Sequence, residues 1–327
     1  MNTYKYVSKS VKKRDVAIDF VKVIATILVL NSHMGICYGK YSMLATGGGI
    51  GDALFFFVSG FTLFLGNKMN FVDWYKRRLG RIYPTVLAVG LVSCIFFGAQ
   101  FSFMEVMVAE QYWFLQCILV LYVILYPIIR YSWKMTICIP IVITVMLIVY
   151  FTCYDFTDSG LFYGINNYFR WIFYSVIMLI GGGICLIRNM IRYKTLALPI
   201  FLICLCLWYV SLKIWGNSNL QIISGIALVG VCVFAYIIGK SPRVEMLFES
   251  KILGNILYIV GNLCLECYMI QYLFFTNHFN YLFPFNIPII MIVVLIASYF
   301  VHLLSEIIKQ IFDSKSFDWK ILLLYKK

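Results

Sequence analysis

Charged residues are scarce in this sequence, and acidic ones are the scarcest. Only 13% of its 327 residues are charged, and 14 Asp and Glu stand against 27 Lys and Arg. A water-soluble domain normally carries about 25% charged residues, so this chain has too few polar side chains to cover a globule of its size. The composition therefore excludes an ordinary soluble protein.

Patterns that indicate several other classes of protein are also missing. The 11 cysteines lie mostly inside apolar runs and have no His or Cys partners at metal-site spacing. No stretch combines the net charge of +13 with a nucleic-acid-binding module. The glycine-rich segment 47–51 lacks the Lys-Ser/Thr pair of a phosphate-binding loop. We therefore expect no metal, no permanently bound cofactor and no nucleic-acid partner.

Apolar sequence, in contrast, is abundant, at 62% of the residues. Ten runs are long enough to cross a hydrocarbon core as helices, which takes about 20 residues each. They do not alternate polar and apolar residues as the strands of a membrane barrel would. The sequence thus predicts an all-α polytopic membrane bundle with ten spans: Val16–Met34, Ile50–Leu65, Ile82–Phe101, Tyr112–Ile129, Met135–Tyr154, Trp171–Ile187, Leu196–Trp215, Gln221–Gly239, Ile256–Phe275 and Ile287–Ile311.

The distribution of basic residues predicts the orientation of the bundle. Most of the 27 Lys and Arg fall in the two tails and in alternate connections between the runs. Short cytoplasmic loops carry such an excess, so both termini are expected in the cytoplasm. The first run is longer than the apolar part of a signal peptide and is expected to remain as a span. We predict a cytoplasmic tail over 1–15, a transmembrane domain over 16–312 and a second cytoplasmic tail over 313–327.

Two ionisable residues mark the first run as a functional candidate. Lys22 and His33 are separated by three helical turns, or about 16 Å of rise, so they project from nearly the same face. Histidine titrates near neutral pH and is the usual general base for a hydroxyl, which makes His33 the main catalytic candidate. The alternatives are a His33 that is merely hydrogen-bonded and a Lys22 that extends to the membrane surface.

Other ionisable residues lie in the later runs. His302 and Glu306 have the i, i+4 spacing that brings two side chains onto one helix face. They could relay protons or neutralise each other, and we favour the second interpretation. Glu266 stands in the middle of an apolar run, where a charge needs a partner or an aqueous cavity.

A basic run, Lys76–Arg81, precedes the third span and is expected in a cytoplasmic loop. Guanidinium groups match phosphate oxygens, so Arg78 and Arg81 could hold a phosphorylated donor that enters from the cytoplasm. The alternative is that this cluster only fixes the orientation of the protein and contacts anionic lipid.

Five segments follow one another along the chain: Ile18–Ala25 with His33, Gly51–Phe61, Arg78–Pro84, Tyr112–Leu115 with Tyr122 and Pro127, and Gly261–Gln271. In this order they resemble the motifs of the acyltransferase-3 family of integral membrane acyltransferases. Two residues depart from the family pattern, since Lys22 stands where arginine is commoner and Gln271 where histidine often lies. A second catalytic histidine at position 271 is therefore excluded.

The resemblance implies a ten-helix, multipass enzyme of the bacterial inner cell membrane. Such an enzyme transfers an acyl group, typically acetyl from acetyl-CoA, to a hydroxyl of a cell-surface polysaccharide or a lipid-linked glycan. His33 would remove the hydroxyl proton or assist the transfer. Acyl-CoA is then a substrate, the carbohydrate and the bilayer are the other partners, and a homodimer is left open. The implied site residues are His33 as the catalytic residue, Lys22, Arg78 and Arg81 for the donor, and Asp52, Ser59, Trp113 and Glu266 in support.

A transporter or flippase for a lipid-linked sugar is the alternative function. Such proteins are typically built from repeated halves around a midplane site. Gly181–Gly183 in the sixth run has no counterpart in the first half of the chain. The absence of an internal repeat favours the enzyme.

Overall fold

A computed structural model describes residues 15–66, 69–99, 112–131, 133–154, 156, 168–312 and 316–324. Nearly all of the tail predicted over 1–15 and part of the tail over 313–327 lie outside these ranges. The described chain contains helices and no strands. Nine of its helices are long and apolar enough to cross a membrane: α1 (Val16–His33), α3 (Gly48–Leu65), α4 (Phe71–Phe97), α6 (Trp113–Tyr131), α7 (Met135–Cys153), α8 (Phe169–Ile187), α9 (Ala197–Trp215), α10 (Ile222–Gly239) and α14 (Asn286–Ile311). The predicted all-α polytopic fold is confirmed.

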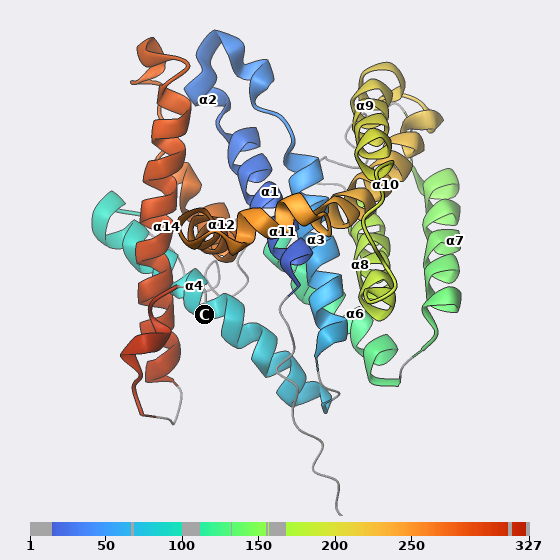
Figure 1. The fold of residues 1–327 in the computed structure, drawn as a ribbon, viewed down its shortest axis with the longest axis horizontal. Helices are drawn as coiled ribbons and strands as arrows, with labels where there is room; N and C mark the ends of the chain where they lie inside the picture. Colours follow the sequence, from blue (N-terminus) through green and yellow to red (C-terminus); the bar gives the residue numbers. More distant parts are fainter. Residues whose placement is uncertain are drawn as a thin grey trace, which may run out of the picture.

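The bundle is centred on α1 and α3. Figure 1 shows these two helices in the middle of the molecule, with α14 and α7 at opposite edges. The shorter elements join the long helices or lie beside their ends. They are α2 (Gly35–Tyr38), η1 (Gly39–Leu44), η2 (Asn219–Gln221), α11 (Pro242–Glu249), α12 (Lys251–Asn262), α13 (Cys264–Ile270), η3 (Gln271–Leu273), η4 (Asn280–Leu282) and η5 (Trp319–Ile321).

The contact between α3 and α8 depends on two glycines. A Cβ atom on Gly60 would clash with the carbonyl of Met178, and one on Gly181 would clash with the carbonyl of Phe57. The two backbones are therefore in direct contact at both positions. Small residues allow such close approach of membrane helices, whose association depends on packing. This contact fixes α3, which carries Asp52 and Ser59.

The third crossing, α4, differs from its predicted bounds. It begins at Phe71, well before Ile82, so the basic run Lys76–Arg81 lies in a helix and the expectation of a loop is wrong. The side chain of Asn70 caps this helix by accepting a hydrogen bond from the backbone N–H of Asp73 at 2.9 Å. Lysine and arginine are good helix formers, so the helix continues beyond its apolar part.

The predicted ninth span, Ile256–Phe275, is not one continuous helix. It is broken at Leu263 into α12 and the pair α13–η3, which meet at a bend of 57°. Asn262 at the break uses its side-chain amide to donate to the Tyr258 carbonyl at 2.6 Å. Such local bonds compete with regular helix formation. Figure 1 shows α12 running at a steep angle to α1.

Contacts at the two ends of α1 show that this broken helix is a crossing. Before it, Lys240 Nζ lies 2.8 Å from Asp15 Oδ2, at the start of α1. After it, Asn286 Nδ2 donates to the Cys37 carbonyl at 2.7 Å, just beyond the end of α1. The chain therefore passes from one end of α1 to the other between residues 240 and 286. Together with the nine continuous helices, this gives ten candidate crossings in the described residues, in agreement with the ten predicted spans.

Candidate functional site

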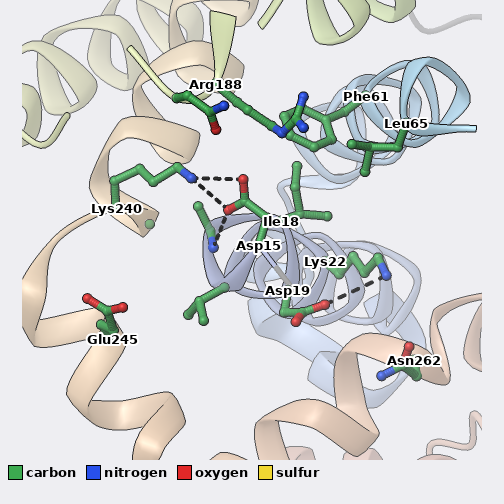
Figure 2. Close-up of a pocket in the computed structure, with 14 residues that line it drawn as sticks. Asp15, Ile18, Asp19, Lys22, Phe61, Leu65, Arg188, Lys240, Glu245 and Asn262 are labelled. Atoms are coloured by element: carbon green, nitrogen blue, oxygen red, sulfur yellow. Dashed lines mark hydrogen bonds and ion pairs between the residues drawn. The ribbon is translucent and has the colours of Figure 1, made fainter. Parts of the chain in front are cut away.

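A large cavity opens beside the first turns of α1. Its volume is about 670 Å³, within the range of small-molecule sites. Lys22 lines it, whereas Arg78 and Arg81 do not. Figure 2 shows side chains from α1, α3, α10, α11 and α12 converging on this space. The polar residues that line it are Asp15, Asp19, Lys22, Arg188, Asn189, Lys240, Glu245 and Asn262.

Acidic and basic groups are mixed around this large cavity. Asp15 is bound on one side, where it accepts hydrogen bonds from Lys240 Nζ and from the Tyr236 hydroxyl, the latter at 2.9 Å. Lys22 Nζ lies 3.8 Å from Asp19 Oδ1, which is near the upper limit for an ion pair. Arg188 uses Nη1 to donate to the Cys185 carbonyl at 2.8 Å. Cations for a phosphate are present, and Lys22 is only loosely paired.

A second, smaller cavity lies between α3, α4, α6 and α13. It has a volume of about 140 Å³ and a mainly apolar lining. The Lys22 Cβ atom packs beside Gly261, three residues before Cys264, which lines this small cavity. Lys22 therefore lines the large cavity from a helix that contacts the segment leading into the small one. The lining residues of the small cavity are Phe55, Ser59, Ile82, Phe114, Leu115, Ile118, Tyr122, Cys264, Leu265 and Tyr268.

The two predicted donor arginines have different surroundings. The Arg78 guanidinium lies over two aromatic rings, 5.3 Å from the centre of Trp74 and 5.9 Å from that of Tyr122. Tyr122 and Ser59 both line the small cavity. Arg81, on the same helix, is exposed. The structure therefore brings Arg78 and Ser59 to the small cavity but leaves Arg81 at the surface.

His33 lies beside a tyrosine that lines the small cavity. The His33 ring packs edge-on against Tyr268, which lines this cavity, with 6.4 Å between ring centres, and against Tyr272 at 5.0 Å. His33 Nδ1 lies 3.0 Å from Nε2 of Gln271. His33 itself is half-buried at the end of α1. Helix α1 thus extends from the large cavity, which Lys22 lines, to the tyrosine side chains around His33.

A buried arginine, Arg170, lies near these aromatic side chains. Asp52 interacts electrostatically with Arg170 and with Tyr268. The Arg170 guanidinium is only 2% exposed, and its carbon lies 3.6 Å from the centre of the Trp113 ring. Two predicted supporting residues, Asp52 and Trp113, thus both lie near Arg170, which the sequence analysis does not single out. Arg170 lies in the first turn of α8.

Glu266 points elsewhere, toward α4 and α14. Its Oε1 lies 3.6 Å from His302 Nδ1 and accepts a hydrogen bond from the Thr85 hydroxyl at 3.4 Å. It does not line either cavity. The expected pairing of His302 with Glu306 is wrong, because Glu306 instead binds Lys309 at 2.9 Å. Lys309, three residues after Glu306 on the same helix, is its partner. His302 instead faces Glu266 of α13.

Two residues of the His33 end were not recognised as candidates from the sequence. Gln271 was noted only because it is not a histidine, and Arg170 was not singled out. An arginine directly before the sixth apolar run is the signal that could have found Arg170. Within the described part of the chain, no group of three His, Cys, Asp or Glu side chains is arranged to hold a metal ion.

Comparison with known proteins gives one match. A family model described as an acyltransferase domain, that of the acyltransferase-3 family, matches residues 15–305. The match begins just before α1 and ends inside α14, so it includes both cavities and His33. The comparisons with curated proteins and with solved structures found no match.

Proposed function

The chain belongs to the acyltransferase-3 family, and from this membership we propose that it transfers an acyl group from acyl-CoA to a hydroxyl of a carbohydrate. Its family and its described helices make it a multipass membrane acyltransferase. The proposal adds acetyl-CoA as the donor and a cell-surface polysaccharide or lipid-linked glycan as the acceptor. It also adds the bacterial inner membrane as the location.

One observation supports this proposal most directly, namely the continuity between Lys22 and His33. Lys22 lines the large cavity and packs beside Gly261, three residues before Cys264 of the small one. Tyr268 lines the small cavity and packs against His33. A donor whose polar part occupies the large cavity could therefore extend its thioester arm along α1 toward His33.

The charges of the large cavity suit the phosphate groups of such a donor. A volume of about 670 Å³ is sufficient for a nucleotide-sized group. Lys22 and Arg188 supply an ammonium and a guanidinium for phosphate oxygens. Asp19 and Glu245 line the same space and repel an anion. A phosphate that binds there therefore needs the positive charges of Lys22 and Arg188. Binding there would loosen the Lys22–Asp19 pair, which is already long at 3.8 Å.

Arg78 has a second, distinct place in the proposal. It lies against Tyr122, at the small cavity, whereas Lys22 lies at the large one. Its Nε is buried without a hydrogen-bond partner in the described part of the chain. A guanidinium in that position can bind an oxygen of the donor where its arm enters the apolar cavity.

At the far end of α1, His33 is the group that acts on the acyl transfer. It is half-buried and reachable, and its ring is held between two tyrosines and Gln271. The acceptor hydroxyl approaches this end of the bundle and attacks the carbonyl carbon of the thioester. His33 either removes the hydroxyl proton or donates a hydrogen bond to the reacting carbonyl.

One structural feature fits the alternative function, a transporter for a lipid-linked sugar. Transporters commonly place their substrate at interrupted helices, and α12–α13 is such a helix. A transporter would move the glycan without forming an acylated product, so chemical analysis of the product separates the two functions.

The test compares His33→Ala with the native protein and with His278→Ala, a matched variant of an exposed histidine. Each is reconstituted in lipid vesicles with acetyl-CoA, and each is expressed in cells whose surface glycan is analysed by mass spectrometry. We expect His33→Ala to insert normally and to lose about 10²–10⁴-fold in acylation rate. His278→Ala should keep full activity. Normal acylation by His33→Ala, or glycan movement without acylation by the native protein, would refute the proposal.

A further inference from the structure

Gln271 is fully buried, and its side-chain nitrogen lies within hydrogen-bond distance of two acceptor groups. Its Nε2 donates to the Tyr268 carbonyl at 3.1 Å and lies 3.0 Å from His33 Nδ1. The side chain belongs to η3 and is 0% exposed, whereas His33 belongs to α1. We propose that Gln271 is a positioning residue, which holds the proton of neutral His33 on Nε2.

The Tyr268 carbonyl decides which way the Gln271 amide faces. If the amide were reversed, its oxygen would lie against the Tyr268 carbonyl oxygen, with no hydrogen between the two acceptors. The amide nitrogen has two hydrogens, one for each neighbour, and it cannot accept a hydrogen bond. The nitrogen therefore faces both Tyr268 and His33. This orientation leaves Oε1 of Gln271 without a partner in the described part of the chain.

The state of the His33 ring follows from this orientation. Because the Gln271 amide donates, Nδ1 of His33 must be the acceptor. Neutral imidazole carries one N–H, so its proton then lies on Nε2. The Val29 carbonyl, one turn earlier on α1, also lies near the ring and would favour an N–H directed toward it. An Nδ1–H bonded to Val29 would instead meet the N–H of Gln271, which excludes that arrangement while the amide stays in place.

This inference rests on the proposed function and assigns His33 one of the two roles left open there. A ring with its proton on Nε2 has no lone pair on that atom, so Nε2 cannot remove the hydroxyl proton. It can donate a hydrogen bond to the carbonyl oxygen of the acyl thioester, where negative charge develops. His33 would then act as the electrophilic group of the site.

The transfer balances with His33 in that role. The acceptor oxygen attacks the carbonyl carbon and forms the new C–O bond. The C–S bond breaks, and its electron pair leaves on sulfur. The hydroxyl proton ends on that sulfur, which gives the free thiol. His33 keeps its Nε2 proton from beginning to end.

The direct test is ¹⁵N NMR of the histidine rings in detergent or lipid. The chain has only 3 histidines, so comparison with His33→Ala and His278→Ala assigns all of the signals. At a pH at which the His33 ring is neutral, we expect its protonated nitrogen to be Nε2. A proton on Nδ1 in the native protein would overturn the inference, whatever the activity of the protein is.

Variants of Gln271 test whether the tautomer of His33 determines the rate of the reaction. In Gln271→Glu, a carboxylate accepts from the ring and should move the proton to Nδ1. Loss of one preorganised donor costs about 10²–10³-fold in kcat, so we expect that loss with an unchanged KM for acetyl-CoA. Gln271→His, whose ring N–H can again donate to Nδ1, should restore the Nε2–H tautomer and most of the rate.

A matched control separates this effect from the burial of a new charge. Asn286 is also a buried amide that donates to a backbone carbonyl and has an unpartnered oxygen, and it binds Cys37 rather than His33. Asn286→Asp should leave the His33 spectrum and kcat unchanged. If Gln271→Glu keeps both the native tautomer and the native kcat, Gln271 has no positioning role. If His33→Ala keeps full activity while the native spectrum shows Nε2–H, the proposed function fails and the tautomer stands.

Discussion

The guanidinium carbon of Arg170 lies 3.6 Å from the centre of the Trp113 ring, and the same guanidinium interacts with Asp52. Three helices meet at this point, because Asp52 comes from α3, Trp113 from α6 and Arg170 from α8. Removal of Arg170 withdraws a cation from the half-buried Asp52 carboxylate and from the face of the Trp113 ring, which costs about 2 kcal/mol. We therefore expect Arg170→Met to destabilise the protein by that amount.

A double-mutant cycle checks this prediction in thermal or denaturant unfolding of the detergent-solubilised protein. Asp52→Asn removes the carboxylate, so Arg170→Met should cost less in the Asp52→Asn background than in the native one. Equal costs in the two backgrounds would show that Arg170 stabilises the fold through Trp113 alone.

The contact between α3 and α8 gives a prediction about stability that is independent of function. Gly181→Ala places a Cβ atom against the Phe57 carbonyl and should destabilise the protein by about 1–3 kcal/mol, as overpacking does. Gly90→Ala is the matched control, since nothing lies within 4 Å of the added Cβ. In α4 that change should be neutral or stabilise by up to about 1 kcal/mol. Unfolding measurements that rank the two variants in the opposite order would contradict the close contact.

The two arginines predicted to bind the donor, Arg78 and Arg81, should differ in their effect on catalysis. Arg78 packs on Trp74 and Tyr122 beside the small cavity, whereas Arg81 is exposed. Lysine keeps the charge but loses the planar fork. Arg78→Lys should therefore raise the KM for acetyl-CoA at least tenfold, a cost of about 1.4 kcal/mol in binding, while Arg81→Lys changes it little. Steady-state kinetics in vesicles measures these KM values. Equal values for both variants would mean that the basic run only fixes the orientation of the protein in the membrane.

The broken helix α12–α13 makes a topological prediction. Because it connects opposite ends of α1, reporter fusions at Lys240 and at His278 should lie on opposite sides of the membrane. The basic run favours the cytoplasm for Arg77, so fusions at Arg77 and Lys240 should both report it. Fusions at Lys240 and His278 on the same side would make α12–α13 a re-entrant loop and reduce the crossings to nine.

The fold could be predicted well because the information lies in local hydropathy. Each apolar run that is long enough to cross a membrane corresponds to one helix, except the ninth, which is broken into α12 and α13. The bounds failed where local chemistry matters more than hydropathy. Hydropathy does not detect the polar first turns of α4, which Asn70 caps, and it does not detect the break at Leu263 inside an apolar run.

The candidate site could be predicted only in part, for a related reason. Lys22 and His33 lie on one helix, so the helical repeat alone relates them. Gln271 reaches His33 across 238 residues of sequence, and Arg170 reaches Trp113 from another helix. The packing of distant helices produces such contacts, and no spacing in a single sequence encodes them. The same limit explains why the partner of Glu266 was not predicted.

The two walls of the small cavity differ in stiffness. On one side α3 is held by backbone contact with α8 at Gly60 and Gly181, and a wall without spare volume does not yield. On the other side α13 has only seven residues, with a sharp bend before it and a 3₁₀ turn after it. If the small cavity holds the acyl chain, as proposed, a bulkier chain would displace α13 rather than α3. This helix carries Tyr268 and leads directly into Gln271, so the width of the acyl chain would then affect the hydrogen bond between Gln271 and His33.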